Sequence, residues 1–366
     1  MTSKQRKAKK AKGQRRKLKA QRSILEPNQH QAQELKHDAP ELKGAETKGR
    51  KAKKFIADGE ARMEKAKSKG HKARKKFVKL IGRHVESHKL EEADRVVLRR
   101  MIGHGPLDNS LLASDAELRR VAGVFLGEAL VKLKKAIPGL HFYFWTFIND
   151  RGNTSDRQPV VDLKGMHSLV DQVFRKHKLA SFSVDEFQGL GNYPRLGKGR
   201  TIMNGVHAIT WSHEQLECEA IMESLNASAV WTCALGADPV HIQPVGLTDG
   251  DLRYLSYYMF KSPYEVKMAQ TREEGIRLKS TEKGNTPEFA MRLFEGLSQL
   301  EMSMIVRSTF DGAKLKADWL RRLMYWHKSR AEWSRNKMPQ FDTEEFWRRI
   351  RSKKRKVEYE PYRFIR

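Results

Sequence analysis

The sequence predicts an α+β protein whose centre is an antiparallel sheet in a split βαβ arrangement. Residues 138–268 alternate between runs of aromatic and β-branched residues, which favour strands, and segments with apolar residues at helical spacing. On both sides of this region the chain shows helical periodicity without strand-like runs. We therefore expect one sheet domain flanked by helical segments, with basic disordered tails at the two ends.

The first 75 residues are rich in Lys, Ala and Gln and hold almost no large apolar residues. Such a segment buries too little surface to offset the entropy of ordering, so residues 1–75 are predicted to be a disordered basic arm. Helical periodicity begins near Phe77 and recurs until Pro138 and Gly139 interrupt it. Residues 76–137 are therefore predicted to be a helical segment, with helices at 77–88, 90–102 and 116–135.

The sheet domain is expected to occupy residues 138–268. Its predicted order is strand, helix, strand, strand, helix, strand, at residues 140–148, 162–178, 180–187, 201–211, 212–224 and 240–245. The last strand is expected near an edge because prolines flank it. A further helix covers residues 249–261. This is the order of ferredoxin-like and RRM-like domains, in which helices cover one face of the sheet and leave the other open for a site.

From residue 269 the pattern is helical again, with helices expected at 287–305 and 313–328. Residues 269–347 are predicted to be a helical C-terminal region. The remaining residues, 348–366, begin with the sequence RRIRSKKRKV and are predicted to be a basic tail.

The charge of the chain indicates a polyanionic partner. There are 72 Lys and Arg against 44 acids, a net charge of +28, and 27 of the basic residues fall within residues 1–80 against 8 acids. Nucleic acid relieves such repulsion by releasing its counterions. The basic stretches lack the apolar face of a membrane-surface helix, and no run approaches a membrane span. Two cysteines exclude a disulfide framework and a zinc quartet, so we expect a protein of a reducing compartment without a membrane partner.

The most informative motif is the helix at residues 254–261 (YLSYYMFK). At about 100° per residue, Tyr254, Tyr257, Tyr258 and Lys261 share roughly one 100° arc, while Leu252, Leu255 and Met259 form the buried stripe. A phenol becomes a nucleophile when nearby positive charge favours phenolate, and an ammonium one turn away supplies that charge. The alternative is that these tyrosines are ordinary packing groups.

A second motif is the strand around His207. His207 shares one face with Gly205 and Ile209, in the middle of an expected central strand, where a polar ring must find a partner. Asp185 and Glu186 on the preceding strand are carboxylates within reach of that region. One imidazole with one or two carboxylates suits Mn²⁺ or Mg²⁺ at a phosphate, although a histidine in such a place is more often a hydrogen-bonded core residue.

Together these motifs resemble the HUH endonuclease superfamily, in particular the rolling-circle replication initiators (Rep proteins) of plasmids and phages. Members have an aromatic first strand that ends near Thr, a strand with His-hydrophobe-His, and a helix with Tyr-x-x-Lys or Tyr-x-x-x-Tyr-x-x-Lys. This chain has FYFWTF at 142–147, GVHAITW at 205–211 and YLSYYMFK at 254–261, in that order. The resemblance covers residues 140–265, about a third of the chain.

The resemblance implies a metal-dependent DNA endonuclease and strand transferase that nicks single-stranded DNA and forms a 5′-phosphotyrosine intermediate. It implies Tyr258 as the nucleophile, Tyr254 as a second nucleophile if two tyrosines act, and Lys261 in a supporting role. It also implies His207 and Glu186 as ligands of Mn²⁺ or Mg²⁺.

One position departs from the family pattern. Gly205 stands where the first His of the His-hydrophobe-His pair is expected, and glycine supplies no ligand. A complete metal shell would need another group, and the candidates are Asn204, Gln188, Asp185, His213 and His241. Alternatively, the site binds metal weakly, or the domain keeps DNA binding without nicking.

Several residues are expected to bind the nucleic acid itself. An exposed set of aromatic side chains can stack unpaired bases, and basic residues neutralise phosphates. The expected stacking residues are Tyr143, Trp145 and Tyr257. The expected phosphate-binding residues are Lys198 and Arg200 in the Gly-rich loop, Arg15 and Arg16 in the N-terminal arm, and Lys353, Lys354 and Arg355 in the tail.

The function expected from the sequence is therefore initiation of rolling-circle replication in the bacterial cytoplasm, in association with the nucleoid. Its expected partners are a single-stranded origin or hairpin DNA and a host helicase. The alternatives are a transposase or relaxase with the same chemistry, a non-catalytic nucleic-acid-binding protein with a degenerate site, and an RNA-binding assembly factor.

Overall fold

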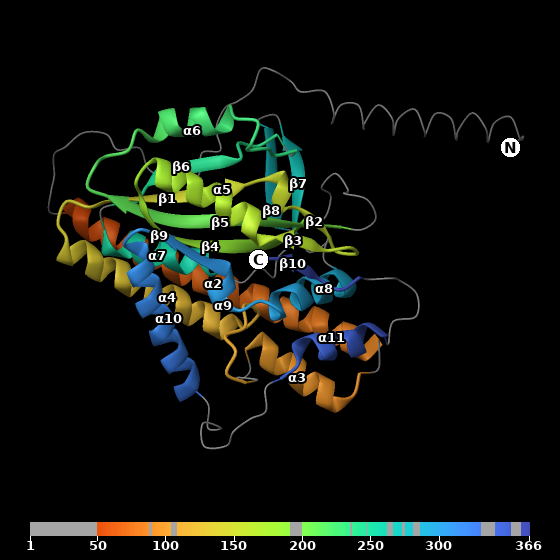
Figure 1. Cartoon of the computed structure of the whole chain (residues 1–366). Helices are drawn as coiled ribbons and strands as arrows, with labels where there is room; N and C mark the ends of the chain where they lie inside the picture. Colours follow the sequence, from red (N-terminus) through yellow and green to blue (C-terminus); the bar gives the residue numbers. More distant parts are fainter. Residues whose placement is uncertain are drawn as a thin grey trace, which may run out of the picture. The chain divides into compact units, whose positions relative to one another are not determined.

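The computed structural model describes residues 50–87, 90–103, 108–190, 200–234, 236–246, 248–261, 266–272, 275–280, 286–330, 341–352 and 360–366 (Figure 1). The chain separates into two compact units, Met1–Lys43 with Gln270–Arg277 and Gly44–Ala269 with Leu278–Arg366. The short strands β7 (Val266–Arg272) and β8 (Gly275–Ser280) contribute residues to both units.

The protein is α+β, as predicted, and the centre of its sheet is antiparallel. Four strands lie in the order β6 (Val240–Pro244), β1 (His141–Ile148), β5 (Thr201–Ser212) and β4 (Ala180–Leu190), each antiparallel to its neighbours. The order continues through β7, which runs parallel to the end of β4, and β8. Strand β6 lies at an edge, as its prolines predict.

One face of this sheet is covered by the two crossover helices, α5 (Leu163–Lys176) and α6 (Cys218–Asn226). The odd-numbered positions of β1 point toward this face, where Tyr143, Trp145 and Phe147 pack against Phe174 of α5 and Trp231. Asp162 caps the N-terminus of α5, and its carboxylate accepts a hydrogen bond from the Gly165 amide.

The opposite face of the sheet is covered as well, which corrects the expectation of an open face. Even-numbered positions of β1, Phe142 and Phe144, pack in one cluster with residues of α4 (Ala116–Ala136), α7 (Asp249–Met259) and α10 (Gly312–Ser329). The reason lies in β1 itself, because its two faces are equally apolar and each must be buried. Figure 1 shows α6 on one side of the sheet and α4 and α10 on the other.

A second apolar cluster joins the helical segments. It is built from the C-terminal half of α2 (Arg50–Ser87), α3 (Glu92–Ile102), α8 (Pro287–Ser298) and α11 (Thr343–Ser352). The prediction of a disordered arm to residue 75 is wrong from residue 50 onward, because α2 begins at Arg50. Ala, Lys, Arg and Glu favour helix even without an apolar stripe, and contacts with the rest of the unit stabilise it.

The remaining elements are short. They are η1 (Asp150–Gly152), β2 (Thr154–Ser155), β3 (Val160–Asp162), α9 (Met302–Ile305), β9 (Val306–Thr309) and β10 (Arg363–Ile365). Strand β9 extends the sheet beside β4, and β10 pairs in parallel with β3. The helix expected at 287–305 ends at Ser298, and the one expected at 212–224 begins only at Cys218.

Candidate active site

The predicted nucleophile, ammonium, carboxylate and imidazole meet on the face of the sheet that α7 covers. Lys261, just beyond the end of α7, donates a hydrogen bond to the Tyr258 hydroxyl at 2.7 Å and lies 2.8 Å from Glu186 Oε1. The other carboxylate oxygen of Glu186 lies 2.5 Å from His207 Nε2. Four side chains from two strands and a helix therefore form one connected chain of polar contacts.

Strand register explains how the two sheet residues meet. Glu186 in β4 pairs with Gly205 in β5, so its nearest same-face neighbour along β5 is His207, two residues further on. On the other side, His207 pairs with Thr146 of β1, whose Oγ1 lies 3.2 Å from His207 Nδ1. Both ring nitrogens of His207 therefore face a polar partner.

The geometry of α7 depends on the helix beneath it. Thr248 begins α7 by accepting a hydrogen bond from the Asp251 amide, and the α4 lysines Lys134 and Lys135 contact Asp249. Gly123 of α4 permits a close approach, because a Cβ there would lie 2.8 Å from the Tyr257 Cα.

The buried Arg119 of α4 fixes the far end of α7. Its guanidinium donates hydrogen bonds to the carbonyls of Phe260 and Lys261, each at 3.3 Å. These carbonyls follow the last turn of α7, where backbone acceptors have no partner within the helix. Arg119 therefore holds the backbone of Lys261, and sequence reasoning missed it because nothing near it in the chain suggests such a partner.

The electrostatics of the site separate a buried layer from a more exposed one. The side chains of Glu186 and His207 are 8% and 6% exposed, whereas that of Lys261 is 24% exposed. Burial raises the pKa of the Glu186 carboxyl, but Lys261 and then His207 outweigh it and hold that pKa well below its usual range. Glu186 is therefore a carboxylate at neutral pH.

The two basic groups respond in opposite ways. Burial lowers the pKa of Lys261, yet the charges of Glu186 and Tyr258 outweigh it and raise that pKa, so the ammonium stays charged. Burial also lowers the pKa of His207, more than Glu186 raises it, so the imidazole is neutral at neutral pH. A neutral ring that donates from Nε2 to Glu186 accepts at Nδ1 from the Thr146 hydroxyl.

Aromatic rings surround the polar chain. Phe144 stacks on His207 with ring centroids 5.3 Å apart, and the Tyr258 ring lies 5.2 Å from the same imidazole. The Lys261 ammonium also lies 3.9 Å from the centroid of the Tyr258 ring. Tyr254 lies one turn earlier, its ring 6.3 Å from that of Tyr258, and burial, followed by Tyr258, raises its pKa. Of the two predicted nucleophiles, Tyr258 is therefore the one whose hydroxyl contacts the ammonium.

The donors at this site do not suit the implied Mn²⁺ or Mg²⁺. No group of three or more His, Cys, Asp or Glu residues among the described residues could hold a metal ion. Gly205, opposite Glu186, adds no donor, and Lys261 contacts the carboxylate oxygen that a cation would use. The residues that the structure describes here therefore do not form a site for a divalent metal ion.

The candidate substitutes for the missing ligand are scattered. Asp185 points to the other face, where it lies 2.5 Å from His167 Nε2 of α5, and buried Asn204 accompanies it. Gln188 reaches the site and donates to Glu186 at 3.4 Å. His213 is exposed at the end of β5. His241 pairs with Thr146, in one row with His207 across three strands, about 10 Å from it by strand spacing.

The structure corrects the predicted stacking residues of β1. Tyr143 and Trp145 are 3% and 0% exposed, in the cluster under α5 and α6. The Tyr143 hydroxyl accepts from the Leu216 amide, and Trp145 donates to Thr210. Neither ring is available to a base, because both faces of β1 are covered.

The other predicted nucleic-acid contacts divide between described and undescribed residues. The side chain of Tyr257 points away from those of Tyr254 and Tyr258. Its backbone lies against Gly123 of α4, and its hydroxyl lies near Gly70 of α2. Arg200 is half-buried, and its guanidinium lies 5.3 Å from the Phe289 ring centroid. The remaining predicted phosphate contacts lie outside the described residues: Lys198, Arg15, Arg16, Lys353, Lys354 and Arg355.

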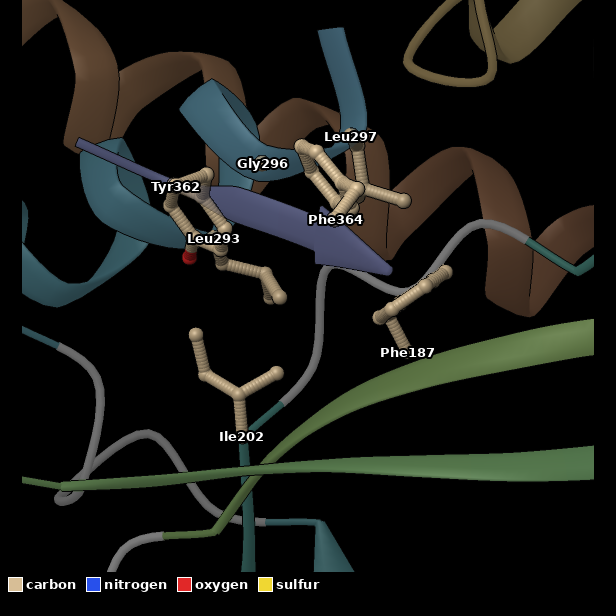
Figure 2. Close-up of a pocket in the computed structure, with 7 residues that line it drawn as sticks. All are labelled: Phe187, Ile202, Leu293, Gly296, Leu297, Tyr362 and Phe364. Atoms are coloured by element: carbon tan, nitrogen blue, oxygen red, sulfur yellow. The ribbon is translucent and has the colours of Figure 1, made fainter. Parts of the chain in front are cut away.

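A separate apolar pocket lies between β4, β5, α8 and β10 (Figure 2). Its walls are hydrocarbon apart from the Tyr362 hydroxyl, which donates to the Arg292 carbonyl. The pocket offers no charged group to a ligand and belongs to the packing of α8 and β10 on the sheet. Its lining residues are Phe187, Ile202, Leu293, Gly296, Leu297, Tyr362 and Phe364.

Comparison of the chain with models of protein families, with curated proteins and with solved structures finds no match. Among the described residues, no helix combines the length and the apolar character needed to cross a membrane.

Proposed function

We propose that this protein is a DNA strand transferase of the rolling-circle initiator type, which cuts a single DNA strand through Tyr258. Its substrate is a single-stranded origin or a hairpin, and a host helicase would extend the opened strand. The observation that carries the proposal is the contact of Lys261 with both the Tyr258 hydroxyl, at 2.7 Å, and the Glu186 carboxylate, at 2.8 Å. If the tyrosines of α7 served only for packing, the contact of Lys261 with the buried Glu186 carboxylate would not be needed.

In the proposed reaction, the phenolic oxygen of Tyr258 attacks a phosphodiester phosphorus. The new bond joins phosphorus to the tyrosine, the bond from phosphorus to the 3′-oxygen breaks, and the phenolic proton is balanced by the proton that the 3′-oxygen gains. Lys261 stabilises the phenolate and the charge that develops on the phosphoryl oxygens. Glu186 positions Lys261, and His207 positions Glu186.

The topology supports this proposal. Numbered along the chain, the strands β1, β4, β5 and β6 stand in the order fourth, first, third, second, all antiparallel, and both crossover helices cover the same face. From this order we infer that the sheet domain is of the split βαβ type, as in the ferredoxin-like or RRM-like fold. Glu186 and His207 lie on the opposite face of the sheet from α5 and α6, and α7 packs on that same face.

The glycine at position 205 favours a second candidate, a nucleic-acid-binding protein without nicking activity. In that function the polar chain from His207 to Tyr258 only stabilises α7 against the sheet. A transposase or relaxase would share the chemistry of the first proposal and differ only in the DNA that it recognises.

The deciding experiment is a search for a covalent protein–DNA adduct. The full chain would be incubated with circular single-stranded phage DNA, and separately with a pool of randomised oligonucleotides that includes hairpins, each with Mn²⁺ and with EDTA. Denaturing gels would detect the adduct, and mass spectrometry would identify the modified peptide. We expect the adduct on Tyr258 and its loss in Tyr258→Phe.

Matched controls are present on the same helix. Tyr257→Phe should leave the adduct unchanged, since that side chain faces α2 and α4, and Tyr254→Phe tests a two-tyrosine cycle. An adduct that persists in Tyr258→Phe would overturn the assignment of the nucleophile. If no adduct forms on any probe although DNA is bound, the non-catalytic candidate is correct.

A further inference from the structure

The carboxylate oxygens of Glu186 and the ring nitrogens of His207, which could ligate a metal, already contact other side chains. Glu186 has one oxygen at 2.8 Å from the Lys261 ammonium and the other at 2.5 Å from His207 Nε2. The remaining nitrogen of His207 faces Thr146. Gly205, which pairs with Glu186, contributes no donor. The chain thus places a fixed positive charge at the position where a divalent cation would contact the carboxylate.

We propose that the Lys261 ammonium is the resident cation of this site and replaces a divalent metal in the transfer reaction. The inference rests on the function proposed above. One ammonium contacts both the carboxylate that holds it and the phenol that reacts, so the same charge can stabilise phenolate and then a phosphoryl oxygen. A divalent ion beside the same carboxylate would be repelled by the ammonium, and the partly buried setting screens that repulsion weakly.

Metal binding is the direct test, and it does not depend on finding the correct DNA. Mn²⁺ would be titrated into the full chain and followed by electron paramagnetic resonance, for the wild type, Lys261→Met, and Lys261→Met combined with Gly205→His. We expect the wild type to bind Mn²⁺ about 10- to 100-fold more weakly than the double variant, which removes the competing cation and adds a donor. Circular dichroism would establish that each variant is folded, and Lys261→Gln removes the charge in its place if Lys261→Met does not fold.

The second arm compares adduct formation on circular single-stranded DNA with EDTA and with Mn²⁺. The inference requires adduct in EDTA within about twofold of the Mn²⁺ rate, and loss of the adduct in Lys261→Met. An adduct that needs Mn²⁺, or wild-type Mn²⁺ binding that Glu186→Gln removes, overturns it while the tyrosine chemistry stands. An absence of adduct in both conditions removes the proposed function instead, and with it the inference.

A different observation, independent of the tyrosine chemistry, concerns the outer face of α10. At about 100° per residue, Lys314, Arg321, Tyr325 and Lys328 fall within an arc of about 60°. All four are exposed, Tyr325 to 78% and the side chain of Arg321 to 79%, with Asp318 paired to Arg321 at the edge of the arc. Three cations therefore follow one another about 10 Å apart, beside an exposed phenol.

The inner face of α10 contacts residues next to the candidate site. Trp319 stacks on Phe260, with ring centroids 5.4 Å apart, and donates to the Ala122 carbonyl of α4. Phe260 directly precedes Lys261. A ligand held on the outer face of α10 would thus have a fixed position relative to Tyr258.

We propose that the outer face of α10 binds duplex DNA through its phosphates. An α-helix with side chains is about 10–12 Å wide, which suits the major groove, and three cations on one face suit the two phosphate strands that border it. The buried residues Trp319 and Leu323 lie on the opposite side of the helix and belong to the same cluster as residues of α4, so the cationic face points away from that contact. Single-stranded DNA lacks such a groove.

The test removes the three charges together and uses an equal removal elsewhere as the control. The triple variant Lys314→Ala, Arg321→Ala, Lys328→Ala would be compared with Lys164→Ala, Arg175→Ala, Lys176→Ala on the exposed face of α5. Fluorescence anisotropy with a 25-bp duplex would be measured over a range of salt concentrations. We expect the α10 variant to bind at least about tenfold more weakly and its salt slope to fall by about 2–3, against little change in the control.

Two results would overturn this proposal. Equal losses in the α5 control would mean that only the total charge matters. A loss confined to single-stranded DNA of the same sequence, with duplex binding intact, would mean that α10 holds the other substrate. Tyr325→Ala, which leaves the charges in place, should weaken duplex binding without changing the salt slope.

Discussion

Replacing Lys261 with methionine should reduce the free energy of unfolding, because it leaves the Glu186 carboxylate buried without its charged partner, beside His207 and Gln188. Removing one partner of a buried ion pair costs about 3–5 kcal/mol. Here the Lys261 side chain is 24% exposed, so solvent screens part of the interaction and we expect about 2–3 kcal/mol. Methionine keeps an unbranched apolar stem at this position but removes the ammonium that lies over the Tyr258 ring.

The double variant Lys261→Met with Glu186→Gln separates charge from packing. If the loss comes from the unpaired carboxylate, the double variant should be more stable than Lys261→Met alone, with a coupling energy of about 1–2 kcal/mol. Chemical denaturation followed by circular dichroism would measure all four proteins. Additive losses would refute the reasoning, because they would mean that Lys261 stabilises the fold without acting on Glu186.

The effect of Lys261→Met on the free energy of unfolding should also depend on pH. In the wild type the pKa of Glu186 lies below its unfolded value, so its contribution is present above about pH 4.3 and is lost as the pH falls through the folded pKa. In Lys261→Met, burial remains without the lysine, which raises the pKa of Glu186. The difference in stability between the two proteins should therefore be largest near pH 7 and shrink toward pH 5.

Three further predictions concern the supports of the site. Gly123→Ala places a Cβ 2.8 Å from the Tyr257 Cα and should lower the free energy of unfolding by about 1–3 kcal/mol. As the control, Gly82→Ala meets no atom within 4 Å and should raise the free energy of unfolding by about 0.5–1 kcal/mol. Denaturation curves would compare the two variants with the wild type. Trp319→Ala should cost about 3–5 kcal/mol and reduce adduct formation, since it removes the contact with Phe260; a stable variant would contradict this. Because burial lowers the pKa of His207, stability should fall as the pH drops below about 6.5, and His207→Gln should flatten that decline in denaturation curves measured from pH 7 to pH 5.

The sequence by itself predicted much of the sheet. The aromatic run of β1, the alternation around His207 and the helical spacing at residues 162–178 each reflect a local pattern that the backbone must satisfy, and β1, β5 and α5 lie where those patterns predict. The buried stripe of α7 is also confirmed, because Leu252, Leu255 and Met259 are buried. By contrast, the strands β9 and β10 are too short to show a local pattern. They form because they pair with β4 and β3, which lie far away in the chain.

The resemblance to the HUH endonucleases in residue types, order and spacing implied Tyr258, Lys261, His207 and Glu186 as one group. Their contacts were decided only by the tertiary structure: the register of β4 on β5 puts Glu186 beside His207, and the glycines of α4 let α7 come close enough for Lys261 to reach the carboxylate. The same long-range packing buried Tyr143 and Trp145 and turned Tyr257 away from the site. Local periodicity determines which face of an element a side chain occupies, whereas what covers that face depends on segments from other parts of the chain.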